Sequence, residues 1–181
     1  GAVVGGLVDH VEADALGTEP RKARLEGLHR RPLGLPEAVA LGLRHQLRIA
    51  GMPMGRELRE GLVYSKETGS IIVVVATDAP LLPHQLQRIA RRPALGLGRM
   101  GSVAGNGSGD IFIAFSTANA QALSGGEPRV QATVLVNDEI DPLFGATVQA
   151  TEEAIVNALV AARDMQGNEG HYARALPHAE L

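Results

Sequence analysis

The chain has 181 residues, a formal net charge of −3 and no cysteine. This length is enough for one domain with its own core, and the small net charge argues against binding nucleic acid or a membrane surface through bulk charge. The lack of cysteine excludes disulfides, thiolate catalysis and cysteine-ligated zinc. No apolar run reaches the roughly 18 residues needed to cross a bilayer, and no basic region precedes the apolar residues 1–7 as in a signal peptide. We therefore expect a cytoplasmic protein whose partners include neither nucleic acid nor a membrane.

Residues 1–42 are rich in Arg, Leu, Gly and His, and their apolar side chains show little regular spacing. We treat them as an atypical N-terminal segment of uncertain fold. His10, Glu12 and Asp14 have side chains that bind metals, but their alternating spacing on an uncertain element is a weak signal. We expect a solvated loop there, with no metal and no other cofactor.

The pattern becomes clearer from residue 43 onward. Leu43 to Ile49 predicts a short strand, and a turn follows it. Ile71 to Thr77 is an apolar run rich in β-branched side chains, which predicts a strand covered on both faces. Pro83 suits the first turn of a helix, and His84 to Arg92 then carries its apolar residues on one face.

Glycine is concentrated in residues 94–110, which we predict to be a loop. Residues 96–101, GLGRMG, match the GxGxxG pattern of dinucleotide-binding proteins. That pattern needs a strand before it and a helix after it, whereas this one follows a helix and leads to a strand, so we exclude a dinucleotide site. Ser108 and Asp110 are the two loop residues that could do chemistry. They precede a second predicted strand, residues 111–117, and would share one face in extended geometry.

Two further elements follow along the chain. Val130 to Val136 is apolar and predicts a third strand. Asp141 and Pro142 then predict the start of a long helix, because Asp is a good cap and Pro fits the first turn. This helix is expected to run to about Met165 and to end at a glycine.

The stretch KETGSIIVVVATDAP, residues 66–80, places Gly69 and Ser70 at the start of the first apolar strand. A small polar step of this kind is usually a turn, but a serine there can also be a nucleophile. A serine hydroxyl is a weak nucleophile until a base takes its proton. If the chain were cut before Ser70, the new α-amine could be that base, because it titrates near pH ~8. Spacing alone leaves both interpretations open.

Three long stretches of the chain are GSIIVVVATDAPLLPHQLQRIARR, GLGRMGSVAGNGSGDIFIAFSTAN and DPLFGATVQATEEAIVNALVAA. They resemble the L-aminopeptidase / D-esterase/amidase family, which includes the β-peptidyl aminopeptidases and is similar in strategy to the N-terminal nucleophile hydrolases. The resemblance runs from about Leu43 to Glu180. It implies an α/β (α+β) fold, a four-layer αββα sandwich that is incomplete at the N-terminus here. It also implies a homo-oligomer without a cofactor that releases N-terminal residues from peptide, amide or ester substrates.

The resemblance further implies which residues act. Family precursors cut themselves at a Gly–Ser bond, which here is Gly69–Ser70, and the serine becomes the nucleophile. A second serine and an acidic residue on the glycine-rich loop assist it, and they match Ser108 and Asp110. The family often has Glu at the acidic position, so Asp110 is a shorter carboxylate of the same charge.

The chain departs from the family pattern in two ways. Only 69 residues precede the cleavage site, whereas family members have a much longer upstream part that supplies strands and much of the substrate pocket. Ala40 also stands where the family has an asparagine that stabilises the oxyanion, and alanine cannot donate that hydrogen bond. We therefore expect an N-terminally truncated chain, with residues 43–69 as the end of the longer subunit and residues 70–181 as the region of the shorter one.

Three hypotheses about function follow from the sequence. The chain is a working self-processing aminopeptidase or amidase, a remnant with weakened catalysis, or an assembly subunit that completes the sandwich of a related chain. Processing separates the first two, because a working enzyme of this kind should exist as two pieces. Co-purification with a longer homologue would support the third.

Overall fold

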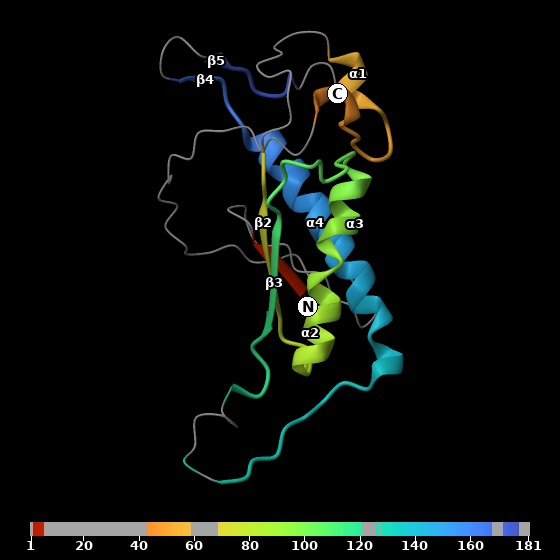
Figure 1. The fold of residues 1–181 in the computed structure, drawn as a ribbon, viewed down its shortest axis with the longest axis vertical. Coiled ribbons are helices and arrows are strands. Elements are labelled where there is room, and N and C mark those ends of the chain that lie inside the picture. The colour runs from red at the N-terminus through yellow and green to blue at the C-terminus, as the bar shows by residue number, and fades with distance from the viewer. Residues whose placement is uncertain are drawn as a thin grey trace.

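The computed structural model of the chain describes residues 2–5, 43–58, 69–120, 126, 128–167 and 172–177. Its elements, in chain order, are β1 (Ala2–Gly5), η1 (Arg44–Gln46), α1 (Met54–Glu57), β2 (Ile72–Thr77), α2 (Pro83–Ala90), α3 (Pro93–Arg99), β3 (Ile111–Ser116), η3 (Asn137–Glu139), α4 (Asp141–Ala161), β4 (Met165–Gln166) and β5 (Tyr172–Ala173). Figure 1 shows a layer of strands beside a layer of helices.

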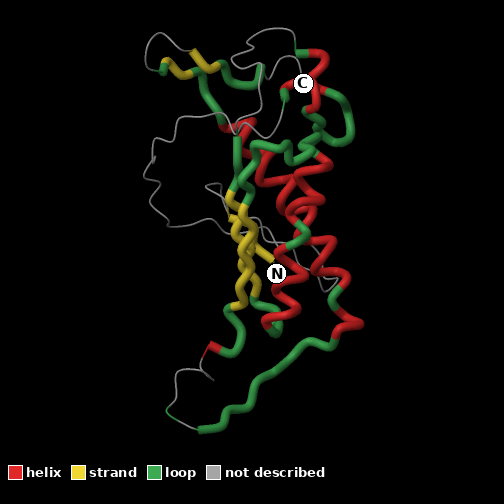
Figure 2. The backbone as a smooth tube through the Cα atoms, viewed as in Figure 1, coloured by secondary structure: helices red, strands yellow, loops and turns green. Residues whose placement is uncertain are grey.

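The main sheet has three strands in the order β1-β2-β3. β1 pairs antiparallel with β2, and β2 pairs in parallel with β3. Parallel strands need a crossover connection, and the chain makes it through α2 and α3 before β3 begins. These two helices and α4 lie on the same face of the sheet (Figures 1 and 2). The described residues therefore form one α layer on one β layer, half of the expected αββα sandwich.

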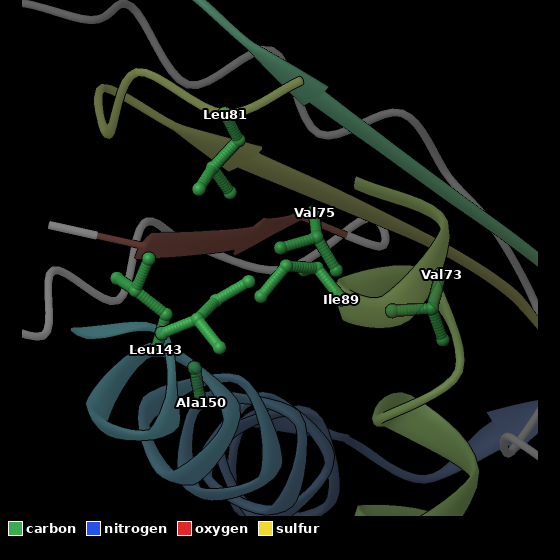
Figure 3. Packing of buried hydrophobic residues seen from close by; sticks show 7 residues of the cluster. Val73, Val75, Leu81, Ile89, Leu143 and Ala150 are labelled. Carbon is green, nitrogen blue, oxygen red and sulfur yellow. The ribbon is translucent and has the colours of Figure 1, made fainter. Parts of the chain in front are cut away.

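The core between the sheet and the helices is aliphatic, as the 3% aromatic content of the chain requires. Val73 and Val75 of β2 lie in one buried cluster with Ile89 of α2 and with Leu143 and Ala150 of α4 (Figure 3). Burying an aliphatic side chain of this size stabilises the fold by about 1.5–3 kcal/mol. The cluster thus anchors β2, the strand that begins just after Ser70.

The two faces of the sheet differ. Val73 and Val75 are buried under the helices, whereas Ile72, on the opposite face, is 58% exposed. On β3, Ile113 and Phe115 are 48% and 45% exposed on that same outer face. The prediction of a strand covered on both faces is therefore wrong for the described residues, because their helices cover one face only.

The predicted strand from Leu43 to Ile49 is also wrong. Residues 44–46 form a turn of 3-10 helix, and Ile49 pairs only with Met52, across a tight turn. The backbone of this segment closes its hydrogen bonds locally, for example from the N–H of Gly55 to the carbonyl of Leu47 at 3.0 Å. A strand would need a partner strand, and the described residues provide none here.

Part of the predicted glycine-rich loop is helical. Pro93–Arg99 forms α3, so the loop spans residues 101–110 rather than 94–110. Gly96 is buried where α3 meets α4, and a Cβ there would lie only 2.8 Å from the Cβ of Thr151. Close helix packing therefore explains this glycine, which the sequence pattern had assigned to a loop.

The predicted strand from Val130 to Val136 is wrong, because these residues form no strand. Backbone groups of this segment bond to residues outside any strand. The side chain of Asn119 donates to the carbonyl of Thr133 at 2.9 Å and accepts its N–H at 3.0 Å, and the N–H of Leu135 donates to the carbonyl of Pro80 at 2.8 Å. An amide side chain thus takes the place that the prediction gave to a neighbouring strand.

The prediction of a long helix after residue 140 is confirmed, although α4 ends at Ala161 rather than near Met165. Ile140 occupies the cap position, and Asp141 is already the first helical residue. The helix buries two hydroxyl groups, and each bonds back to the preceding turn: Thr147 donates to the carbonyl of Leu143 at 2.7 Å and Thr151 to that of Thr147 at 2.8 Å. These bonds remove the cost of burying unpaired polar atoms.

Candidate active site

The site lies where the two parallel strands begin. β2 and β3 pair so that each residue of β2 lies beside the residue 39 positions later in the chain. Extending this register toward the amino ends places Ile71 beside Asp110. The N–H of Ile71 donates to the carboxylate Oδ1 of Asp110 at 3.1 Å, and the N–H of Ile111 donates to the carbonyl of Ile71 at 2.9 Å. The carboxylate therefore holds the residue that follows Ser70.

One step further along the same register, Gly109 lies beside Ser70. Its backbone N–H donates to the Ser70 Oγ at 2.8 Å. A hydrogen bond of this kind stabilises the negative charge that develops on an oxygen losing its proton. A Cβ at position 109 would lie 3.4 Å from the same Oγ, an ordinary contact distance, so the contact itself does not require glycine.

Gly109 was missed as a functional residue in the sequence, where only its neighbours Ser108 and Asp110 were singled out. A signal for it was nonetheless present. Once β2 and β3 are taken as parallel with Ile72 beside Ile111, counting back two residues on each strand pairs Ser70 with Gly109.

The four predicted site residues differ in position. Ser70 is exposed, and Gly69, Ser108 and Asp110 are half-buried. The N–H of Ser108 donates to the carbonyl of Gly105 at 2.8 Å, which closes a turn of the loop. Its hydroxyl makes no hydrogen bond to either of the described side chains Ser70 and Asp110. The structure therefore brings Gly109 and Asp110 to the start of β2 and leaves Ser108 one residue further out.

Other predictions fall on residues that the structure does not describe. His10, Glu12, Asp14 and Ala40 all lie outside the described residues, so the expectations of a solvated loop and of a missing oxyanion donor stay predictions. Within the described ranges, no three or more His, Asp or Glu side chains gather closely enough to hold a metal ion. In the same ranges, no helix has both the length and the apolar character needed to cross a membrane.

Comparison with known proteins adds to this geometry. The sequence profile of peptidase family S58 matches residues 32–173. Over 182 residues the chain is 46% identical to the beta-peptidyl aminopeptidase BapA of Sphingosinicella microcystinivorans, a match that covers 91% of this chain and 45% of that protein. It is 39% identical over 191 residues to BapA of Sphingosinicella xenopeptidilytica, covering 97% of this chain and 47% of that one.

These matches extend beyond the stretch on which the resemblance was based. The family profile begins at residue 32 rather than near 43. A match that covers 97% of the chain also leaves room for few unmatched residues at either end, so it reaches well into residues 1–42. The chain nevertheless spans less than half the length of these two relatives.

A solved structure is similar as well. The L-aminopeptidase D-Ala-esterase/amidase of Ochrobactrum anthropi matches with a TM-score of 0.68 and 44% identity, over 77% of this chain and 39% of that one. That protein is described as a prototype for the serine aminopeptidases and as a new variant among the Ntn hydrolase fold. The profile match and the sequence identity lead to one conclusion: this chain is a member of peptidase family S58, with the α/β fold of the Ntn hydrolases.

Proposed function

We propose that this chain is a self-processing serine aminopeptidase or amidase in which Ser70 is the nucleophile. One observation carries the proposal: the exposed hydroxyl of Ser70 stands at the start of β2 and accepts a hydrogen bond from the N–H of Gly109. An accessible serine can attack a carbonyl once a base takes its proton, and the fixed donor would stabilise its oxygen as that proton leaves. Membership of family S58 supports the same role.

Self-processing would begin with attack of the Ser70 Oγ on the carbonyl carbon of Gly69. The bond from this carbon to the Ser70 nitrogen breaks, the proton lost by the hydroxyl ends on that nitrogen to give a free α-amine, and Gly69 is held as an ester on the Oγ. Water then hydrolyses the ester, which leaves a carboxylate on Gly69 and a free serine at the start of the second fragment. The Gly109 N–H would stabilise the negative charge that develops on the Ser70 Oγ as its proton leaves in the first step.

In turnover, the same Ser70 Oγ would attack the carbonyl carbon of a substrate. The free α-amine of Ser70 serves as the base that takes the hydroxyl proton, since an α-amine titrates near pH ~8 and is partly neutral at pH 7. The relatives are named for β-peptidyl, L-amino-acid and D-alanyl substrates. We accordingly propose peptides, amides or esters with a free N-terminal residue as substrates. Asp110 and Ser108 would assist by orienting the start of β2 and by moving protons.

A second candidate is an assembly subunit or a remnant with weakened catalysis. It is favoured by the outer face of the sheet, which the described helices leave uncovered and where Ile72 and Ile111 are 58% and 51% exposed. In that case Ala40 would leave the oxyanion without a donor, and loss of one donor typically lowers kcat by about 10²- to 10³-fold. The homo-oligomer and the cytoplasmic location stay predictions, which native mass spectrometry and cell fractionation would test.

Incubation of the purified chain followed by intact-mass measurement tests the main proposal. We expect two fragments, residues 1–69 and 70–181, without added protease, and none from Ser70→Ala. Ser102→Ala is the matched control, because Ser102 lies on the same loop and its hydroxyl only accepts the N–H of Ala104 at 3.2 Å. A wild-type chain that stays intact through long incubation would contradict self-processing and favour the second candidate.

A further inference from the structure

The sequence contains one asparagine that is followed by glycine, Asn106–Gly107, and this pair lies on the glycine-rich loop. Both residues are exposed. They are the central pair of a turn, which a hydrogen bond from the N–H of Ser108 to the carbonyl of Gly105 closes at 2.8 Å. The pair therefore presents a side-chain amide and a neighbouring backbone nitrogen to solvent.

The groups of this pair that could react with each other have no other partner. Among the described residues, no hydrogen bond involves the side-chain amide of Asn106 or the N–H of Gly107. Glycine has no Cβ to shield its nitrogen, and its backbone has the widest conformational freedom, so this nitrogen can turn toward the Asn106 side chain. An amide with bonds inside the fold would have to break them first.

The other asparagines of the described ranges show the opposite arrangement. The Asn119 side chain bonds to both backbone groups of Thr133, and the Asn137 Oδ1 accepts hydrogen bonds at 3.1 and 3.2 Å. Asn157 is exposed, but its backbone and that of the next residue lie within α4. Each of them is also followed by a residue that carries a side chain. Only Asn106 therefore combines exposure, unbonded groups and a following glycine among these residues.

We propose that Asn106 is a site of spontaneous deamidation, a covalent modification of the loop beside Ser70. The nitrogen of Gly107 attacks the side-chain carbonyl carbon of Asn106 and gives up its proton, and the side-chain nitrogen leaves as ammonia. The product is a cyclic imide, and water then adds to either carbonyl carbon of its ring. Opening at the side-chain carbon gives aspartate. Opening at the main-chain carbon gives isoaspartate, in which the chain continues through the side chain.

The two products affect the turn differently. Aspartate adds a negative charge at an exposed position, where solvent and salt screen it, and leaves the main chain as it was. Isoaspartate adds a carbon atom to the main chain inside the turn and so displaces Ser108. Gly109 follows directly, and its N–H would lose its alignment with the Ser70 Oγ. A slower reaction at Ser70 rests on the proposed function, whereas the modification rests on the turn alone.

The modification is tested in the full chain with Ser70→Ala, incubated for days at mildly alkaline pH, so that success or failure of self-processing does not affect the result. The tryptic peptide 100–129 contains both Asn106 and Asn119. Mass spectrometry is expected to find the gain that comes from replacing NH2 with OH at Asn106, and an isoaspartyl methyltransferase should label the same residue. No gain there, or a gain no faster than at Asn119, would overturn the proposal.

A substitution at Gly107 identifies the attacking nitrogen. Positive φ among the described glycines is confined to Gly51 and Gly101, so alanine suits the backbone at position 107. Gly107→Ala is expected to slow the mass gain by about 5-fold or more, the equivalent of the conformational advantage of about 1 kcal/mol that glycine has over alanine. Gly98→Ala is the control, because nothing lies within 4 Å of its Cβ position. Equal rates in wild type and Gly107→Ala would contradict attack by this nitrogen.

The effect on the donor is measured at the Gly109 amide of the chain that retains Ser70. Ion exchange separates the isoaspartate form from fresh protein. In that form, hydrogen exchange of the Gly109 amide is expected to rise by about 5- to 10-fold, as loss of a hydrogen bond does. Asn106→Asp, which adds only the charge, should leave this exchange unchanged. Equal exchange in the isoaspartate form and in fresh protein would overturn the proposed effect on the contact with Ser70.

Discussion

The two ends of the β2–β3 pair contrast sharply in their hydrogen bonding. At the amino ends, Ser70 is exposed, and one backbone N–H, from Gly109, contacts its hydroxyl oxygen. At the carboxyl ends, the hydroxyl of Ser116 donates to the carbonyl of Ala79 at 2.6 Å, and the hydroxyl of Thr77 accepts the N–H of Ala79 at 3.1 Å. One serine is therefore open to a reactant, and the other is committed to the fold.

A buried glutamine extends the network at the carboxyl ends. Gln85 of α2 is 2% exposed, and its side chain accepts the N–H of Leu82 at 2.8 Å. The same side chain donates to the carbonyl of Leu135 at 2.9 Å and to the Oδ1 of Asn137 at 3.1 Å. These bonds tie the start of α2 to the segment that leads into α4.

The contrast teaches where chemistry is possible in a simple α/β unit. Polar groups whose bonds are all used within the fold stabilise it but are not available to a substrate. A nucleophile needs free approach by the reactant, and Ser70 is exposed with a single backbone donor on its oxygen. The backbone pairing of β2 with β3 sets the register, and the register places Gly109 beside Ser70 at the amino ends.

The largest expected effect is at the amino ends of β2 and β3, beside Ser70. Asp110→Asn can still accept the Ile71 N–H but loses the charge, and Ser108→Ala loses the hydroxyl. Each should slow formation of the fragment that starts at Ser70 by about 10²-fold, as loss of a positioned proton-transfer group does. Time-resolved intact mass gives the rate. Ser116→Ala, at the carboxyl end of β3, should leave this rate unchanged. A similar slowing in all three variants would contradict a functional difference between the two ends of the strands.

The next largest effect is on the free energy of unfolding, through the buried network at the carboxyl ends of β2 and β3. Gln85→Ala should lower the free energy of unfolding by about 1–3 kcal/mol, because it leaves buried polar groups without partners. Chemical denaturation measures the change. Gln87→Ala on the same helix is the control, since Gln87 is exposed. If the two variants were equally stable, the buried network would not stabilise the fold as described.

A smaller, local effect is expected at Asn119. This residue has a φ of +60°, which glycine adopts without strain, so Asn119→Gly removes the side-chain amide and keeps the backbone. Loss of its bonds to Thr133 should raise amide hydrogen exchange at Thr133 by about 5- to 10-fold, the equivalent of a net hydrogen bond of about 1 kcal/mol. Exposed Asn106, changed to Gly, should leave that amide unaffected. Unchanged exchange in Asn119→Gly would mean that the Asn119 side chain does not hold the Thr133 backbone in place.

The smallest effect concerns Asp164, the residue just before β4. A hydrogen bond from the Tyr172 hydroxyl at 2.7 Å, and then one from the Ala175 N–H at 2.8 Å, lower the pKa of its carboxyl. The stabilisation is therefore present above the ordinary Asp pKa of about 3.9 and is lost as the pH falls through the lowered value. Tyr172→Phe should raise the pKa toward the ordinary range in a carbon-13 NMR titration. An identical titration midpoint of Asp164 in both proteins would contradict a role for the Tyr172 hydrogen bond.

Some features could be predicted from the sequence because they depend on neighbouring residues. The apolar run after Ser70 made a strand, Pro83 began a helix, and Pro142 lies in the first turn of the longest one. The position of Ser70 at the start of that strand also followed from the order of residues alone. Local backbone preference and side-chain spacing are sufficient for such predictions.

Other features were decided only by the tertiary structure, because their causes lie far away in the chain. Gly96 belongs to a helix that packs against α4, and Val130 to Val136 has no partner strand among the described residues, where the Asn119 side chain bonds to Thr133 instead. The donor to Ser70 is likewise set by a register that joins residues 39 positions apart. The family resemblance pointed to Ser70 and to the glycine-rich loop, and the parallel pairing of two strands decided which atom of that loop reaches the Ser70 hydroxyl.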